Sequence, residues 1–96
     1  MFIILLHFSE NKNQAKDHMD GHNQWLQQGF SDEVFMLAGG VKPRMGGVIL
    51  AHNASFDEIQ ERVNVDPFVT ANVVSPEILE VSPSKAQEKL QFLLDE

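Results

Sequence analysis

The sequence of 96 residues contains no cysteine. A chain without cysteine forms no disulfide and offers no thiolate to a zinc ion, which excludes disulfide frameworks and cysteine-ligated zinc sites. This composition agrees with a reducing compartment, and we expect a cytoplasmic protein. Internal repeats and low-complexity tracts are also missing, and the length suits one small domain.

Basic residues are scarce. Seven Lys and Arg stand against fourteen Asp and Glu, which gives a net charge of −7. Such a charge disfavours binding to nucleic-acid phosphates and to anionic membranes, so we expect neither as a partner. The apolar run at residues 2–8 is too short to cross a bilayer. It also lacks the basic segment that precedes the apolar region of a signal peptide. It predicts a buried strand.

Several motifs that mark common chemistries are absent. No glycine pattern suits a phosphate, and none of Ser9, Ser31 and Ser55 lies in a nucleophile elbow. His18 and His22 have the i, i+4 spacing with which two imidazoles share a zinc ion, but the sequence places no third ligand. We therefore expect no metal and no cofactor.

Hydrophobic patterns predict an α+β protein with the order βαββαβ and a further helix. Strands are predicted at residues 2–8, 34–38, 47–51 and 73–81, and helices at 14–28, from 56 onwards, and from 82 to the end. A split βαβ arrangement with right-handed crossovers gives a ferredoxin-like antiparallel sheet with both main helices on one face. We expect a domain at residues 1–82 and a C-terminal helical extension at 83–96.

Local signals set the expected boundaries. Gly29 is expected to end the first helix, and Gly39-Gly40 to close the second strand. Ser55 and Glu58 form a capping box for the second main helix. Asn72 suits a left-handed position after the helical turn that begins at Asp66-Pro67, and Pro76 predicts an edge strand or a bulge.

The predicted sheet is apolar on both faces. Ile3 and Leu5 alternate with Phe2, Ile4 and Leu6, so two helices on one side leave an apolar face uncovered. This pattern favours a homodimer in which the sheets of two copies pack together. The competing interpretation is that the C-terminal helix folds back over the second face.

His22 and Asp66 are the most informative pair, although 44 positions separate them in the chain. A carboxylate that holds one ring nitrogen of a histidine fixes its tautomer and leaves the other nitrogen as a base. Two structural interpretations stay open beside this one. His22 suits a buried core histidine, and Asp66 before Pro67 suits a helix N-cap.

The motifs around this pair resemble the YCII-related (YciI-like) family. They are His22-x-x-Trp25-Leu26-x-x-Gly29, the strand end Leu37–Gly40, Gly47–Leu50, and Asp66-Pro67-Phe68-Val69. The resemblance covers about residues 1–82 and implies a dimeric α+β barrel with a catalytic dyad, here His22 and Asp66. Some relatives are dehydrochlorinases of aromatic breakdown products, and muconolactone isomerases are more distantly similar. The family often has Gly-Pro where this chain has Gly39-Gly40.

The resemblance and the dyad together predict a lyase or isomerase that acts on a small carbonyl or carboxylate compound. Trp25 and Phe68 are expected to form pocket or core walls, and Gly39 and Gly40 to expose backbone amides or simply to serve the hairpin. Lys42 and Arg44 either contact an anionic substrate or are simply exposed to solvent. The alternative function is a ligand-binding or accessory dimeric module without turnover.

Overall fold

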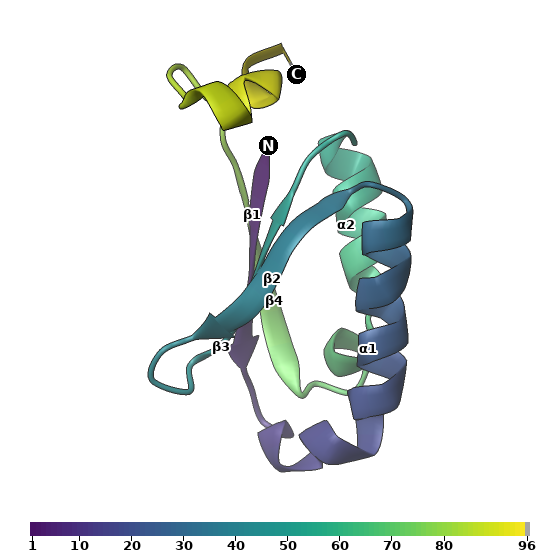
Figure 1. The fold of residues 1–96 in the computed structure, drawn as a ribbon. Helices are drawn as coiled ribbons and strands as arrows, with labels where there is room; N and C mark the ends of the chain where they lie inside the picture. The colour runs from purple at the N-terminus through teal and green to yellow at the C-terminus, as the bar shows by residue number, and fades with distance from the viewer. Residues whose placement is uncertain (96) are drawn as a thin grey trace.

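The computed structural model describes residues 1–95 as a four-stranded antiparallel sheet with helices on one face (Figure 1). The strands are ordered β2-β3-β1-β4, which confirms the predicted ferredoxin-like βαββαβ arrangement. None of the described helices is both long and apolar enough to cross a membrane. The elements are β1 (Phe2–Phe8), the 3₁₀ turn η1 (Lys12–Gln14), α1 (Ala15–Ser31), β2 (Phe35–Val41), β3 (Gly46–Ala51), α2 (Phe56–Asn64), α3 (Pro67–Thr70), β4 (Val74–Glu80) and the 3₁₀ segment η2 (Glu88–Asp95).

The core lies between the sheet and the helices. Alternate residues of a strand point to opposite faces, and in β1 the side chains of Phe2, Ile4 and Leu6 are the buried set. Helix α2 contributes Ile59 and Val63, which are four residues apart and fully buried. These contacts fix α1 and α2 against the same face of the sheet.

The first helix and the second strand both continue past the predicted ends. Helix α1 runs to Ser31, so the prediction that Gly29 ends it was wrong. A Cβ at Gly29 would lie 2.1 Å from a ring carbon of Phe35, so the glycine serves close packing between α1 and β2. Glu33 takes the left-handed conformation instead, with φ of 61°.

Gly39 and Gly40 lie inside β2 and do not close it, which corrects the second predicted boundary. Their backbones pair with β3, Gly39 opposite Val48 and Gly40 opposite Gly47, because the ladder needs backbone groups and no side chain. At the other side of the hairpin, Gly46 has φ of +129°, and a Cβ there would lie 2.0 Å from the carbonyl oxygen of Leu6. The hairpin end therefore requires glycine at that position.

Two local predictions around β4 are confirmed. Asn72 has φ of 58° and follows α3 in the left-handed conformation. Pro76 lies in β4, which is an edge strand of the sheet, where a missing N–H on the outer side breaks no ladder bond.

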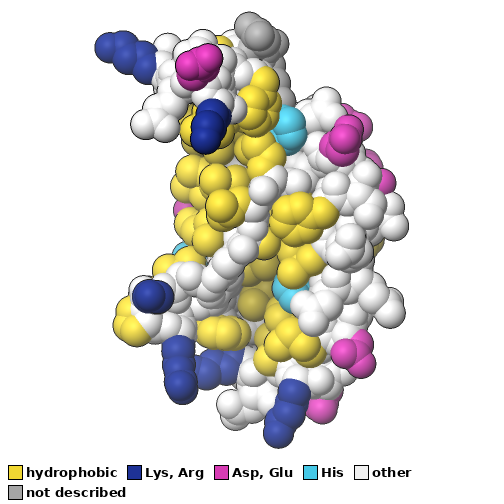
Figure 2. All heavy atoms as spheres, viewed as in Figure 1, with side chains coloured by type: hydrophobic (Ala, Val, Ile, Leu, Met, Phe, Trp, Pro, Cys, Tyr) yellow, Lys and Arg dark blue, Asp and Glu magenta, His cyan; other side chains and the backbone are white. Residues whose placement is uncertain are grey.

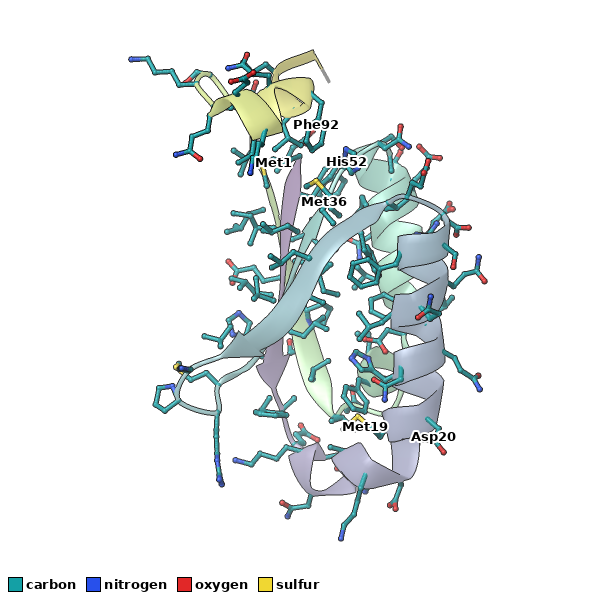
Figure 3. All side chains as sticks on the ribbon, viewed as in Figure 1. Met1, Met19, Asp20, Met36, His52 and Phe92 are labelled. Carbon is teal, nitrogen blue, oxygen red and sulfur yellow. The ribbon has the colours of Figure 1, made fainter. Side chains whose placement is uncertain are left out.

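The C-terminal segment differs from its prediction. Residues 88–95 form 3₁₀ turns and no α-helix. They lie beyond the end of the sheet, where Leu93 is buried and the ring of Phe92 is 5.4 Å from that of His52 (Figures 1 and 3). The interpretation that this segment covers the second sheet face was therefore wrong. Leu37 and Leu79 on that face remain 52% and 40% exposed.

The predicted capping box is present at the start of α2. Ser55 Oγ accepts a hydrogen bond from the Glu58 amide at 3.2 Å, and Glu58 Oε1 accepts one from the Ser55 amide at 2.8 Å. The hydrogen bond from the Ser55 backbone, followed by the one from its side chain, lowers the pKa of Glu58. The ionised Glu58 therefore stabilises the fold at neutral pH, and this contribution is lost as the pH falls through the lowered pKa.

We expect Ser55→Ala to lower the free energy of unfolding by about 1 kcal/mol, the usual value of an N-cap side chain. Urea denaturation at neutral pH measures this loss. Glu58→Gln is also expected to destabilise the protein at neutral pH, and its difference from the wild type should shrink in acid. Glu61→Gln, outside the box, is the control, and an equal effect of both glutamine variants would contradict the role of the box.

Candidate functional site

The fold brings His22 and Asp66 into contact. Nδ1 of His22, in the middle of α1, lies 2.8 Å from Oδ1 of Asp66, the N-cap of α3. The side chain of His22 is 11% exposed and that of Asp66 is fully buried. Asp66 stays extended and Pro67 starts the helix, because proline has no N–H to lose at that position. This local geometry aims the carboxylate at α1.

The hydrogen bonds of Asp66 fix the tautomer of His22. Oδ1 of Asp66 also accepts from the amide of Phe68 at 3.0 Å, so the N-cap interpretation and the dyad interpretation both apply. When Asp66 is ionised it only accepts hydrogen bonds, so Nδ1 of His22 is then the donor and Nε2 of the neutral ring keeps a lone pair. Oδ2 of Asp66 is buried and has no hydrogen-bond partner within the described part of the chain. Within that part, the carboxylate is bound through Oδ1 alone, to His22 and to the amide of Phe68.

Aromatic side chains hold the imidazole in place. The ring of His22 stacks on Phe68 with centroids 4.0 Å apart and planes 6° apart. Trp25 is a second aromatic neighbour, and its ring centroid lies 5.6 Å from that of His22. Trp25 is itself fixed, since its Nε1 donates to the carbonyl oxygen of Arg62 at 2.9 Å. The ring of His22 has little freedom to turn.

His22 borders open space on the sheet side of α1. It lines two adjoining hollows of about 210 and 250 Å³, which share Leu6, Leu26, Gly39 and Gly47. We call these together the dyad hollow. Hydrophobic side chains surround it, with a histidine among them in the space-filling view (Figure 2). A buried base beside an apolar cavity of this size is a typical arrangement of a small-molecule site.

The predicted site residues take different places. Phe68, Gly39 and Gly40 line the dyad hollow, and a Cβ at Gly39 would meet no atom within 4 Å. Trp25 does not line it. Trp25 touches His22 from the side and borders a separate surface hollow with Arg62.

Met19 and Asn23 are among the lining side chains of the dyad hollow that sequence reasoning did not assign to the site. Both lie on α1: Met19 is three residues before His22 and on the same helix face, and Asn23 follows His22 directly. Figure 3 shows Met19 on the sheet side of α1 and Asp20 on the side away from it. Asn23 supplies a polar amide at the edge of an apolar cavity.

No group of three or more His, Asp or Glu side chains within residues 1–95 is arranged to hold a metal ion. His18 lies one turn before His22 and does not line the dyad hollow.

Comparison with known proteins gives a family and a fold. The sequence profile of the YCII-related domain matches residues 1–83. No curated protein matches the chain in sequence. Among solved structures, a similar one is 5-chloro-2-hydroxyhydroquinone dehydrochlorinase from Burkholderia phenoliruptrix AC1100, in complex with 2,5-dihydroxybenzoquinone. It is 16% identical, with a TM-score of 0.68 over 84% of this chain and 93% of the other.

Proposed function

We propose that this chain, which belongs to the family of proteins with a YCII-related domain, is an enzyme in which His22 removes a proton from carbon next to a carbonyl group. The observation that carries the proposal is the 2.8 Å contact between His22 and the buried Asp66 at the wall of the dyad hollow. A base held in this way needs no rearrangement before it accepts a proton.

The proposed step is a proton transfer to Nε2 of His22. The electron pair of the broken C–H bond forms the carbon–carbon double bond of an enolate. In an isomerisation, His22 returns the proton to another carbon. In an elimination, the enolate re-forms its carbonyl and its carbon–carbon electron pair makes a new double bond to the neighbouring carbon. Chloride leaves that carbon with the electron pair of the carbon–chlorine bond, and His22 later releases the proton to water. The negative charge of Asp66 stabilises the imidazolium between these steps.

The remaining contacts support this assignment. Phe68 stacks against His22 and offers an apolar wall to the substrate. Gly39 and Gly40 leave room for a substrate close to the backbone of β2. Trp25 positions the imidazole. The similarly folded dehydrochlorinase, by its name, removes chloride from an aromatic compound, which supports elimination as one of the two reaction types.

Solvent exchange tests the proposal without a known substrate. Small ketones and oxo acids are incubated with the protein in heavy water, and proton NMR follows the replacement of hydrogen next to the carbonyl. We expect the protein to accelerate this exchange for the compounds that bind. Binding to the dyad hollow without any exchange above the buffer rate would overturn the proposal and favour a binding module.

We also propose that two copies pair through the outer sheet face. Ile3 lies between Leu50 and Leu79 in the ladder, and Leu37 lies opposite Leu50, so four aliphatic side chains form one row across the sheet. Leu5 continues the apolar surface beside Val48. Soluble monomers rarely expose a contiguous apolar row, so we expect a second copy to cover it.

Solution mass tests the dimer. The chain of 10.8 kDa is expected to sediment as twice that mass, and the pair Leu37→Glu with Leu79→Glu to convert it to monomer without unfolding. Val65→Glu, at a position 65% exposed in the loop between α2 and α3, is the matched control. A monomeric wild type at micromolar concentration would contradict the pairing.

Cytoplasmic location and the division between residues 82 and 83 stay predictions.

A further inference from the structure

A larger hollow of about 600 Å³ lies at the end of the β2–β3 hairpin. Three cationic side chains line it: Lys12 of η1, and Lys42 and Arg44 of the hairpin loop. We call it the basic hollow. Its three cations come from two segments 30 positions apart in the sequence, which the fold brings together.

The basic hollow and the dyad hollow have three lining residues in common. Phe8, Gly40 and Gly46 line both, so the two cavities share one wall at the ends of β1, β2 and β3. A molecule long enough to extend from His22 along this wall would come to the three cations. Together the cavities have the size of an ordinary small-molecule site.

The charge of the basic hollow contrasts with that of the chain. Three of the seven Lys and Arg residues gather there in a protein with a net charge of −7. No acidic side chain of the described residues lines this hollow, and the ion pairs of the structure lie elsewhere, for example between Arg62 and Asp32. Figure 2 shows Lys and Arg side chains around the hairpin end, with Asp and Glu along the helix side.

Lys12, Lys42 and Arg44 are exposed, so water and salt screen their mutual repulsion in part, and a bound anion would lower it further. Lys12 is also placed, with its Nζ 5.5 Å from the centre of the Phe8 ring, directly over the wall that the two hollows share. A cation at this position would contact the part of a ligand that extends out of the dyad hollow.

From these observations we infer that the basic hollow binds a carboxylate of the substrate, whose carbonyl-bearing part then lies beside His22. The substrate class is thus a small carbonyl compound with a carboxylate at its far end. The inference rests on the proposed function for the role of His22. The carboxylate gives binding energy away from the reacting carbon, and so fixes the distance and direction at which that carbon meets Nε2.

Binding of a matched pair of probes tests the inference. 2,5-Dihydroxybenzoate and its carboxamide differ in charge but hardly in shape, and titration calorimetry at low and high salt measures both. We expect the carboxylate to bind at least about tenfold more tightly, with a preference that weakens as salt rises. The triple variant Lys12→Gln, Lys42→Gln, Arg44→Gln is expected to remove the preference.

The control variant carries Lys85→Gln and Lys89→Gln, which removes cations from the exposed C-terminal segment. It is expected to keep the preference. Equal binding of the two probes by the wild type, or equal loss in the triple and control variants, would overturn the inference.

Failure of the inference and of the proposed function are separable. His22→Gln is expected to lose solvent exchange and to keep the preference for the carboxylate. A wild type that prefers the carboxylate but exchanges no proton would retain the anion site and refute the proton transfer. A wild type that exchanges protons equally well on neutral and anionic ketones, with no effect of the triple variant, would support the proton transfer and refute the anion site.

Discussion

His22→Gln is expected to slow solvent exchange by about 10²–10⁴-fold, the usual contribution of a general base. Glutamine has a similar reach, and its amide can still donate to Oδ1 of Asp66, but it has no nitrogen that accepts a proton at neutral pH. The hydrogen bond and the filled volume therefore persist while the chemistry is removed. Proton NMR of the exchanging compound gives the rate, and thermal unfolding shows that the variant is folded.

The matched control is His18→Gln. It makes the same replacement one turn earlier on α1, at a residue that does not line the dyad hollow. We expect its exchange rate to stay within about twofold of the wild type, because a residue outside the site changes neither base nor cavity. If both variants lose the same fraction of activity, the effect belongs to the helix, and the assignment of His22 as the base fails.

The sequence predicts the dyad because each partner has a local reason for its position. His22 lies on the apolar side of a helix with clear periodicity, and Asp66 lies before Pro67, a pattern typical of an N-cap. The family resemblance joins the two positions. The separation of 44 residues is closed only by the crossover of the fold, which places α1 and α3 side by side.

Other features depend on contacts that no local pattern carries. The residue type of Gly29 predicts a helix end, but in the structure this glycine lets the Phe35 ring approach α1. The apolar residues after position 88 suit an α-helix, yet the segment forms 3₁₀ turns and buries Leu93 beyond the sheet end. The basic hollow needs Lys12 from η1 beside the hairpin, and sequence reasoning considered only Lys42 and Arg44.

Asp66→Ala is expected to give the largest loss of stability in this protein. It leaves the Nδ1 proton of His22 and the amide of Phe68 without an acceptor, both in the buried interior. Removing one partner of a buried pair costs about 3–5 kcal/mol. For a domain of this length about 1 kcal/mol shifts the melting temperature by about 4–8 °C, so calorimetry should record a fall of more than about 10 °C.

Asp66→Ser separates the two duties of the carboxylate. Serine is as good an N-cap as aspartate and can still accept from Phe68, but its shorter side chain does not reach His22. We expect it to recover about 1 kcal/mol relative to Asp66→Ala and to recover none of the exchange activity. If the serine variant regains both stability and activity, Asp66 acts as a cap alone. A double-mutant cycle that combines Asp66→Ser with His22→Leu, which removes the hydrogen bond to Asp66, measures the coupling of the two side chains, because the cycle cancels the capping term.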